Sequence, residues 1–156
     1  MSFEITTEFL EKLTSYIEGS KNKSIISLFE EMHYADVAEI LDELSFDKVV
    51  YIIKLLDSEK TSAVLMELDE DIREKILQNL SAKEIAEEVE ELDSDDAADI
   101  IGELSEERQE AVMSQIEDEE QVKEIEELLT YDEDSAGGLM AKELVKVNEN
   151  WSVLKC

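Results

Sequence analysis

The chain has 156 residues, of which 43 are aspartate or glutamate and 14 are lysine or arginine, so its formal charge is −29, yet 43% of residues are hydrophobic. That apolar content can bury the core of one domain, whereas the charge excludes nucleic acid and anionic membranes as partners and favours a cation or a basic surface. One histidine and one cysteine (Cys156) are too few for a nucleophilic catalytic site, so we expect no enzyme.

The longest apolar run, at residues 49–53, is far shorter than the roughly 18 to 20 residues that span a bilayer. The N-terminus also lacks a basic stretch followed by an apolar one. We therefore expect neither a membrane span nor an export leader in this sequence. The lone cysteine excludes an internal disulfide, which fits a reducing cytosolic setting.

The first element in chain order is a leading helix at about residues 3–18. Its apolar residues recur at helical spacing, and Gly19 follows as a helix stop signal. The apolar positions are Phe9, Leu10, Leu13, Tyr16 and Ile17.

A repeat of 12 residues then runs over about residues 24–129. It is marked by Met32, Leu44, Leu56, Leu68, Leu80, Leu92, Leu104, Ile116 and Leu128. The residue three positions earlier is apolar in every unit. The residue four positions earlier is apolar in all units except two, where Glu88 and Glu124 stand. This i, i+3, i+4 pattern predicts a series of helices that each bury one face.

Polar clusters between the units predict where each helix begins, for example Ser81 and Glu84, which have the spacing of a capping box. A unit of 12 leaves about nine helical residues, fewer than the roughly 12 to 15 that a lone helix needs in water. Each helix must therefore pack on its neighbours. The sequence predicts an all-α superhelical solenoid of short helices, armadillo-like, with no strand before residue 140.

Several single residues have structural interpretations. His33 follows Met32 at an expected helix end, where an imidazole can interact with the helix dipole. Met32, Met66 and Met113 fall on or near the apolar stripe and are expected in the core.

The repeat ends before YDEDSAGGLM, residues 131–140. Asp132, Asp134, Gly137 and Glu143 have the spacing of a calcium loop, but Ala136 and Met140 replace two of its ligands. A phosphate loop would need lysine and Ser/Thr after the second glycine, and the sequence has neither.

We therefore interpret the stretch as a domain junction, where a helix stops at Ser135 to Gly138 and the glycines supply the bend. Residues 143–153 have the β-branched and aromatic content of a strand around a turn. The predicted division is a helical domain at 1–130 and, at 131–156, a junction with the first strand of a second domain.

The best local candidate for a cation site is DSDDAAD, residues 93–99. Asp95 and Asp99 are four residues apart and share a helix face, where their charges repel unless a cation lies near. The alternative is that Asp93 and Asp95 cap the helix while Asp99 belongs to a solvated face.

The junction YDEDSAGGLMAKELVKVNENWSV, together with ILDEL and EELDSDDAADII before it, resembles the sequence that joins the acidic N domain to the first CBS motif in the MgtE magnesium transporter family. The resemblance covers nearly the whole chain and implies a protein cut after its N domain. It implies Mg²⁺ as ligand and a cytoplasmic place on a membrane transporter. It further implies the CBS and transmembrane domains of the same chain as partners, in a homodimer whose bound ions close the pore.

By the same resemblance, Asp95 and Asp99 match the positions from which the N domain offers carboxylates to Mg²⁺ at the CBS interface. A further acidic position of some members falls on Ala63 here. One or two carboxylates with water hold Mg²⁺ only weakly, so we expect weak binding by this chain alone. The competing interpretation is an acidic protein-interaction scaffold without a metal, because short-helix solenoids also resemble the middle domains of flagellar motor switch proteins.

Overall fold

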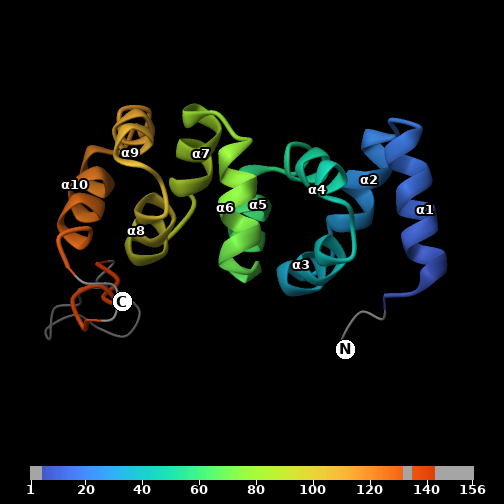
Figure 1. The fold of residues 1–156 in the computed structure, drawn as a ribbon, viewed down its shortest axis with the longest axis horizontal. Helices are drawn as coiled ribbons and strands as arrows, with labels where there is room; N and C mark the ends of the chain where they lie inside the picture. The colour runs from blue at the N-terminus through green and yellow to red at the C-terminus, as the bar shows by residue number, and fades with distance from the viewer. Residues whose placement is uncertain (1–4, 132–134, 143–156) are drawn as a thin grey trace, which may run out of the picture.

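The fold of the protein was obtained as a computed structural model, which describes residues 5–131 and 135–142. Within these residues the chain forms helices and no strands (Figure 1). The helices are α1 (Thr7–Glu18), α2 (Asn22–Phe29), α3 (Tyr34–Asp42), α4 (Phe46–Ile53), α5 (Ser58–Glu67), α6 (Glu70–Gln78), α7 (Ala82–Val89), α8 (Ser94–Gly102), α9 (Glu106–Met113) and α10 (Glu119–Leu128). The all-α prediction is therefore confirmed, while the predicted strand at 143–153 lies outside the described residues.

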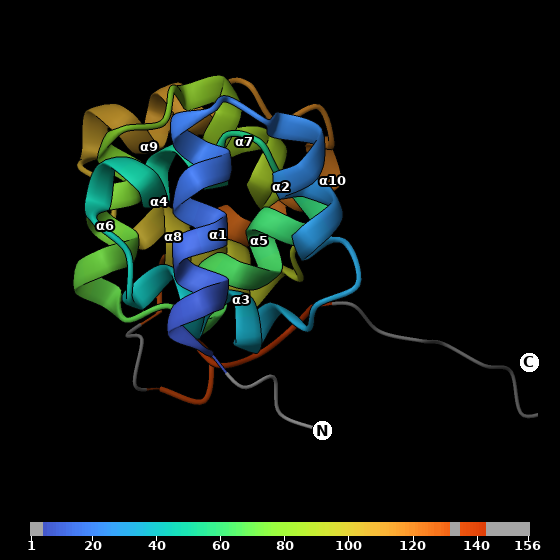
Figure 2. The same cartoon turned by 90° about the vertical axis from the view of Figure 1, so that its right-hand side faces the viewer.

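The helices pack on their second neighbours along the chain rather than forming one layer. Helix α3 packs on α5, α5 on α7 and α7 on α9, while α8 packs on α10. The helices follow one another along an elongated array (Figure 1), and seen from its end they surround a common interior (Figure 2). One structural unit is thus a pair of successive helices, which corresponds to two of the 12-residue sequence units.

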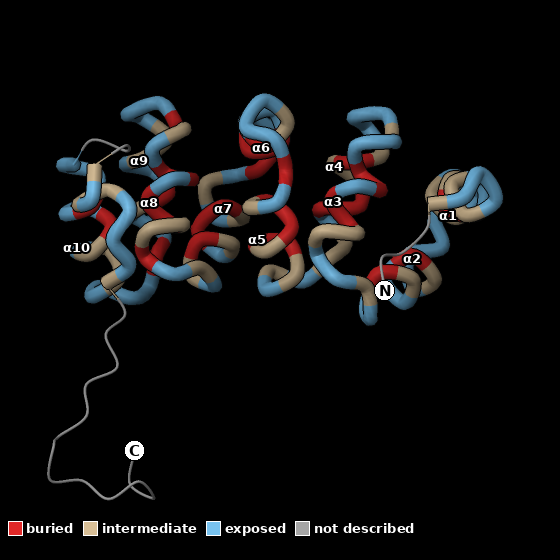
Figure 3. Tube along the Cα trace, turned by 90° about the horizontal axis from the view of Figure 1, so that it is seen from below, coloured by how far each residue is buried: buried red, intermediate tan, exposed pale blue. Residues whose placement is uncertain are grey.

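The core follows the predicted stripe. Residues three positions before each repeat marker are buried, except for the half-buried Met113. The buried ones are Phe29, Leu41, Ile53, Leu65, Leu77, Val89, Ile101 and Ile125. Figure 3 shows buried residues along the middle of the array with exposed residues at its edges. Met32, Met66 and Met113 pack against this core, as predicted.

Helix starts are only partly as predicted. The capping box at α7 is confirmed, because the Glu84 amide donates to Ser81 Oγ (3.2 Å) and the Ser81 amide donates to Glu84 Oε2 (2.7 Å). These hydrogen bonds hold the pKa of the Glu84 carboxyl below its ordinary value. The dipole role predicted for His33 is wrong. Helix α2 already ends at Phe29, so His33 precedes α3, where its Nδ1 accepts from the Ala35 amide (3.3 Å).

A recurring contact closes the helix ends. The third residue of a helix reaches back to the carbonyls that end the helix three places earlier. In α9, Arg108 Nη2 donates to the carbonyls of Leu77 (3.0 Å) and Leu80 (2.8 Å) at the end of α6. The same contact is made by Lys60 to Met32, and by Gln121 to Val89 (3.2 Å) and Leu92 (3.1 Å). Carbonyls at the end of one helix thereby gain a side-chain donor from across the array.

Glu88 departs from the apolar stripe. Its Oε2 atom is buried and has no hydrogen-bond partner. Burial, followed by the charges of Glu87, Asp57, Glu91 and Glu84, raises the pKa of the Glu88 carboxyl from 4.5 to about 8. The side chain is therefore mostly protonated at neutral pH, which reduces the charge buried between α5 and α7.

We predict that Arg108→Met lowers the free energy of unfolding by about 1–3 kcal/mol, since it leaves two terminal carbonyls without their charged donor while keeping an apolar stem. Urea denaturation would measure this. The control is Lys83→Met, because Lys83 is 75% exposed and its pair with Glu87 is long (3.6 Å), so we expect a change of at most about 0.5 kcal/mol. Equal losses in both variants would contradict the role given to Arg108.

A second prediction concerns pH. Because the folded-state pKa of Glu88 lies above its ordinary value of 4.5, its contribution to stability is complete below that pH and is lost as pH rises through about 8. Glu88→Gln should remove this loss and make the variant about 1–2 kcal/mol more stable than the native chain at pH 8, a figure reduced for partial solvent exposure.

Urea denaturation at several pH values would test this prediction. The difference between the two stability curves should grow from pH 5 to pH 8. Glu110→Gln, at an exposed glutamate of α9, is the control and should run parallel to the native curve. A Glu88→Gln curve that also ran parallel would show that the carboxyl ionises normally.

Candidate functional site

The predicted acidic pair lies on α8. Asp95 is the second residue of this helix and is half-buried, and Asp99 is exposed one turn later. Their spacing of four residues places both on one side of the helix. Asp93 occupies the position before the helix, but its side chain makes no capping hydrogen bond. Asp93 therefore gives the capping alternative no supporting side-chain hydrogen bond.

Asp99 lines a cleft and lies near an ion pair. The cleft has a volume of about 240 Å³ and is lined by Ala98, Asp99, Gly102, Gln109, Leu128, Leu129, Tyr131 and Gly138. Behind it, Arg73 Nε donates to both carboxylate oxygens of Glu103 (2.9 and 3.1 Å). The hydrogen bond that Arg73 donates to Glu103, followed by the charges of Glu103, Glu70 and Asp99, raises the pKa of Arg73, while burial opposes the rise. The Asp99 carboxylate therefore lies in the field of a fixed guanidinium.

The pair can provide only part of a cation site. Within residues 5–131 and 135–142, no three aspartate, glutamate, histidine or cysteine side chains come together as a group that could hold a metal ion. Carboxylates on an accessible helix face do suit a small hard cation that keeps most of its water. Asp95 and Asp99 could therefore supply at most two ligands to such an ion.

The junction differs from its prediction. Helix α10 ends at Leu128, so the expected helix stop at Ser135 to Gly138 is wrong. The hydroxyl of Thr130 donates to the Glu127 carbonyl (2.6 Å), and the Tyr131 amide bonds to Leu128 rather than to Glu127. The last turn therefore tightens and the helix closes before the acidic residues are reached.

Beyond the helix, residues 135–142 fold back on the array. The Leu139 amide donates to the Ser135 carbonyl (3.1 Å), which makes a turn. Further on, the Lys142 amide donates to Ser94 Oγ (2.9 Å) at the start of α8. Sequence reasoning missed Ser94, because a single serine 48 residues from its partner gives no local signal.

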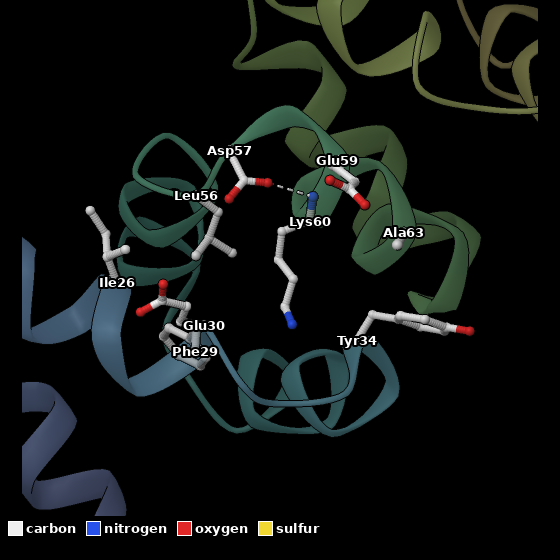
Figure 4. Close-up of a pocket in the computed structure, with 9 residues that line it drawn as sticks. All are labelled: Ile26, Phe29, Glu30, Tyr34, Leu56, Asp57, Glu59, Lys60 and Ala63. Atoms are coloured by element: carbon white, nitrogen blue, oxygen red, sulfur yellow. Dashed lines mark hydrogen bonds between the residues drawn. The ribbon is translucent and has the colours of Figure 1, made fainter.

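A larger pocket lies elsewhere, among α2, α3 and α5, with a volume of about 420 Å³ (Figure 4). The Lys60 side chain extends into it and its ammonium donates to the Met32 carbonyl. Ala63 is one of its apolar walls and supplies no ligand. The lining contains carboxylates, one ammonium and a phenol, but no histidine or cysteine, and it therefore suits helix packing better than nucleophilic catalysis.

None of the helices in the described ranges combines the length and the apolar character that a membrane span needs.

Comparison with known proteins identifies the family. The family described as the MgtE intracellular N domain matches residues 32–134. A crystal structure of the soluble part of a magnesium transporter resembles the fold at 21% identity and a TM-score of 0.74, covering 88% of this chain and 54% of its own. The cytosolic domain of the Mg²⁺ channel MgtE in complex with ATP has 27% identity and a TM-score of 0.74, covering 85% of this chain and 54% of its own.

The chain therefore spans about half the length of the solved structures it matches. No curated protein matches its sequence. The family match covers more than half of the residues and includes α8 with its acidic pair and the start of the junction. On this evidence the chain belongs to the family of MgtE intracellular N domains.

Proposed function

We propose that this chain is the regulatory N domain of a Mg²⁺ transporter or channel, at the cytoplasmic face of the membrane, and that it senses Mg²⁺ through Asp95 and Asp99. The observation that carries the proposal is an accessible acidic pair on α8 inside the segment that matches the family. The domain has no catalytic role in this proposal. Its output is a change in its position relative to the domains that follow.

The proposed site is one half of an ion site. Mg²⁺ is usually held by one or two carboxylates and several waters, so this surface can bind it only weakly by itself. The remaining ligands come from the facing CBS domain, which follows the junction in the proposed arrangement of residues 1–130 and 131–156. Ions that bind only the closed arrangement shift the population towards it.

Charge supplies the energy difference between the two arrangements. A chain with a net charge of −29 repels another acidic surface, and the repulsion acts over a Debye length of about 8 Å at physiological salt. Divalent ions between the surfaces offset it. Low Mg²⁺ thus favours separated domains, and high Mg²⁺ favours a compact assembly, proposed to be a homodimer that closes the pore.

The scaffold alternative receives less support. A protein-interaction domain of the motor switch type accounts for the helices and the acidic surface, but the family match is to the MgtE N domain. Under that alternative, removing Asp95 and Asp99 would have no effect on the response to Mg²⁺.

The corresponding prediction has two parts. The 156-residue chain should bind Mg²⁺ with a dissociation constant on the order of millimolar or weaker, because two carboxylates form a poor cage. Joined to its following domains it should become compact as Mg²⁺ is added, and Asp95→Asn with Asp99→Asn should raise the concentration needed. Calorimetry would measure the first and small-angle scattering the second.

The matched control is Glu106→Gln with Glu110→Gln on α9. It removes the same charge at the same spacing. Both residues are exposed, and Glu106 lies in the first turn of α9 as Asp95 does in α8. The control should leave the Mg²⁺ midpoint near its native value, and helical content by circular dichroism should be unchanged in both double variants. Equal midpoints for the two pairs would reduce the effect to general charge and refute a site on α8.

A further inference from the structure

Within the junction, the backbone at Gly137 lies close to the ring of Tyr131, just after the end of α10. A Cβ atom built on Gly137 would lie 2.6 Å from Cδ1 of Tyr131, so only glycine allows this backbone so near the ring. Neither glycine has a positive φ. Gly137 therefore serves close approach, and the bend expected from its conformational freedom is not what the backbone uses.

Lys142 anchors the end of the described junction to two helices at once. Its amide donates to Ser94 Oγ (2.9 Å), and Ser94 is fully buried at the first position of α8. Its ammonium pairs with Glu127 of α10 (2.6 Å), and the Lys142 side chain is only 17% exposed. Helices α8 and α10 pack on each other, so Lys142 is attached to one packed unit.

These contacts bring the backbone of residues 135–142 close to the acidic pair. Ser94 immediately precedes Asp95, and Gly138 of the junction lines the same cleft as Asp99. A displacement of the start of α8 therefore displaces the backbone at Lys142. Ser135 to Gly138, which the sequence alone interprets as the bend of a junction, and residues 139–142 after them are thus attached to the helix that carries the acidic pair.

We propose that Ser94 and Lys142 are positioning residues that clamp the junction to α8, so that residues 135–142 move together with the helical domain. This inference rests on the proposed function. It deepens that function by naming the connection through which the acidic pair holds its place relative to the facing half of the ion site.

The clamp matters because of effective concentration. Two half-sites joined by a short, ordered connection meet more often than two joined by a long flexible one. Releasing residues 135–142 would lengthen the flexible connection and add the entropy of ordering it again when the ion binds. Loss of the clamp should thus raise the Mg²⁺ concentration required for compaction, although no ion ligand has been altered.

Hydrogen exchange tests the clamp itself, without Mg²⁺, on the 156-residue chain. Residues 135–142 should be protected in the native protein, and Ser94→Ala should release the amide of Lys142. Lys142→Met, which lies outside the helical core and keeps the backbone amide, should weaken the protection through loss of the Glu127 pair. The controls are Ser114→Ala, at the exposed residue that follows α9, and Lys123→Met, at an exposed position on α10. Rapid exchange of 135–142 in the native chain would overturn the inference.

The second measurement is the Mg²⁺ midpoint of compaction in the chain joined to its following domains. Ser94→Ala should raise it roughly fivefold, the factor that corresponds to one hydrogen bond of about 1 kcal/mol, and Lys142→Met should raise it in the same direction. If both leave it unchanged while the Asp95 and Asp99 variant raises it, the inference is wrong and the proposed function stands. If the aspartate variant also leaves it unchanged, the proposed function is wrong, and the positioning role of the clamp falls with it.

Discussion

The structure depends on contacts between helices that are too short to stand alone. Helices of 8 to 12 residues leave a large share of their carbonyls without an intrahelical partner, and in water most of them would not form. The third residue of a later helix repeatedly meets this need, as Lys60, Arg108 and Gln121 do. Two further contacts join helices that are three places apart. Lys48 of α4 donates to the Thr14 hydroxyl of α1, and Lys54 at the end of α4 donates to Glu84 of α7. The array is therefore held by hydrogen bonds between third neighbours as well as by its apolar core.

This dependence explains what could be predicted from the sequence. The 12-residue apolar period and the Ser81 capping box are local, so the helices, the core and the fold class followed from them. The end of α10 at Leu128 and the contact of Ser94 with the junction depend on the tertiary structure. A single polar residue carries no sequence signal for a partner that is distant in the chain. His33 was misplaced for a related reason, because α2 stops three residues before its apolar marker, Met32. For the site, position and spacing of the aspartates were predictable, whereas the cleft beside Asp99 was not.

Several cations among the described residues are used in internal contacts. Arg73 is bonded to Glu103 with both side chains mostly buried, Arg108 closes the end of α6, and Lys142 pairs with Glu127. Such residues stabilise particular places and leave the charge of the surface largely uncompensated. An acidic domain built in this way attracts mobile cations from solution, and the attraction weakens as salt rises. The charges that stabilise the array are thus separate from the carboxylates that the proposed function assigns to divalent ions.

Acidic density alone does not decide which carboxylates can respond to an ion. Glu88 has four acidic neighbours, yet its burial raises its pKa to about 8, so it carries a proton at neutral pH and offers little charge to a cation. Asp95 and Asp99 stand on a helix face that water reaches, where a hydrated ion can approach without losing its shell. The same residue chemistry thus yields a neutral packing group in one place and a water-accessible charge in the other. Exposure, rather than the number of acids, therefore decides which carboxylates a hydrated ion could reach under the proposed function.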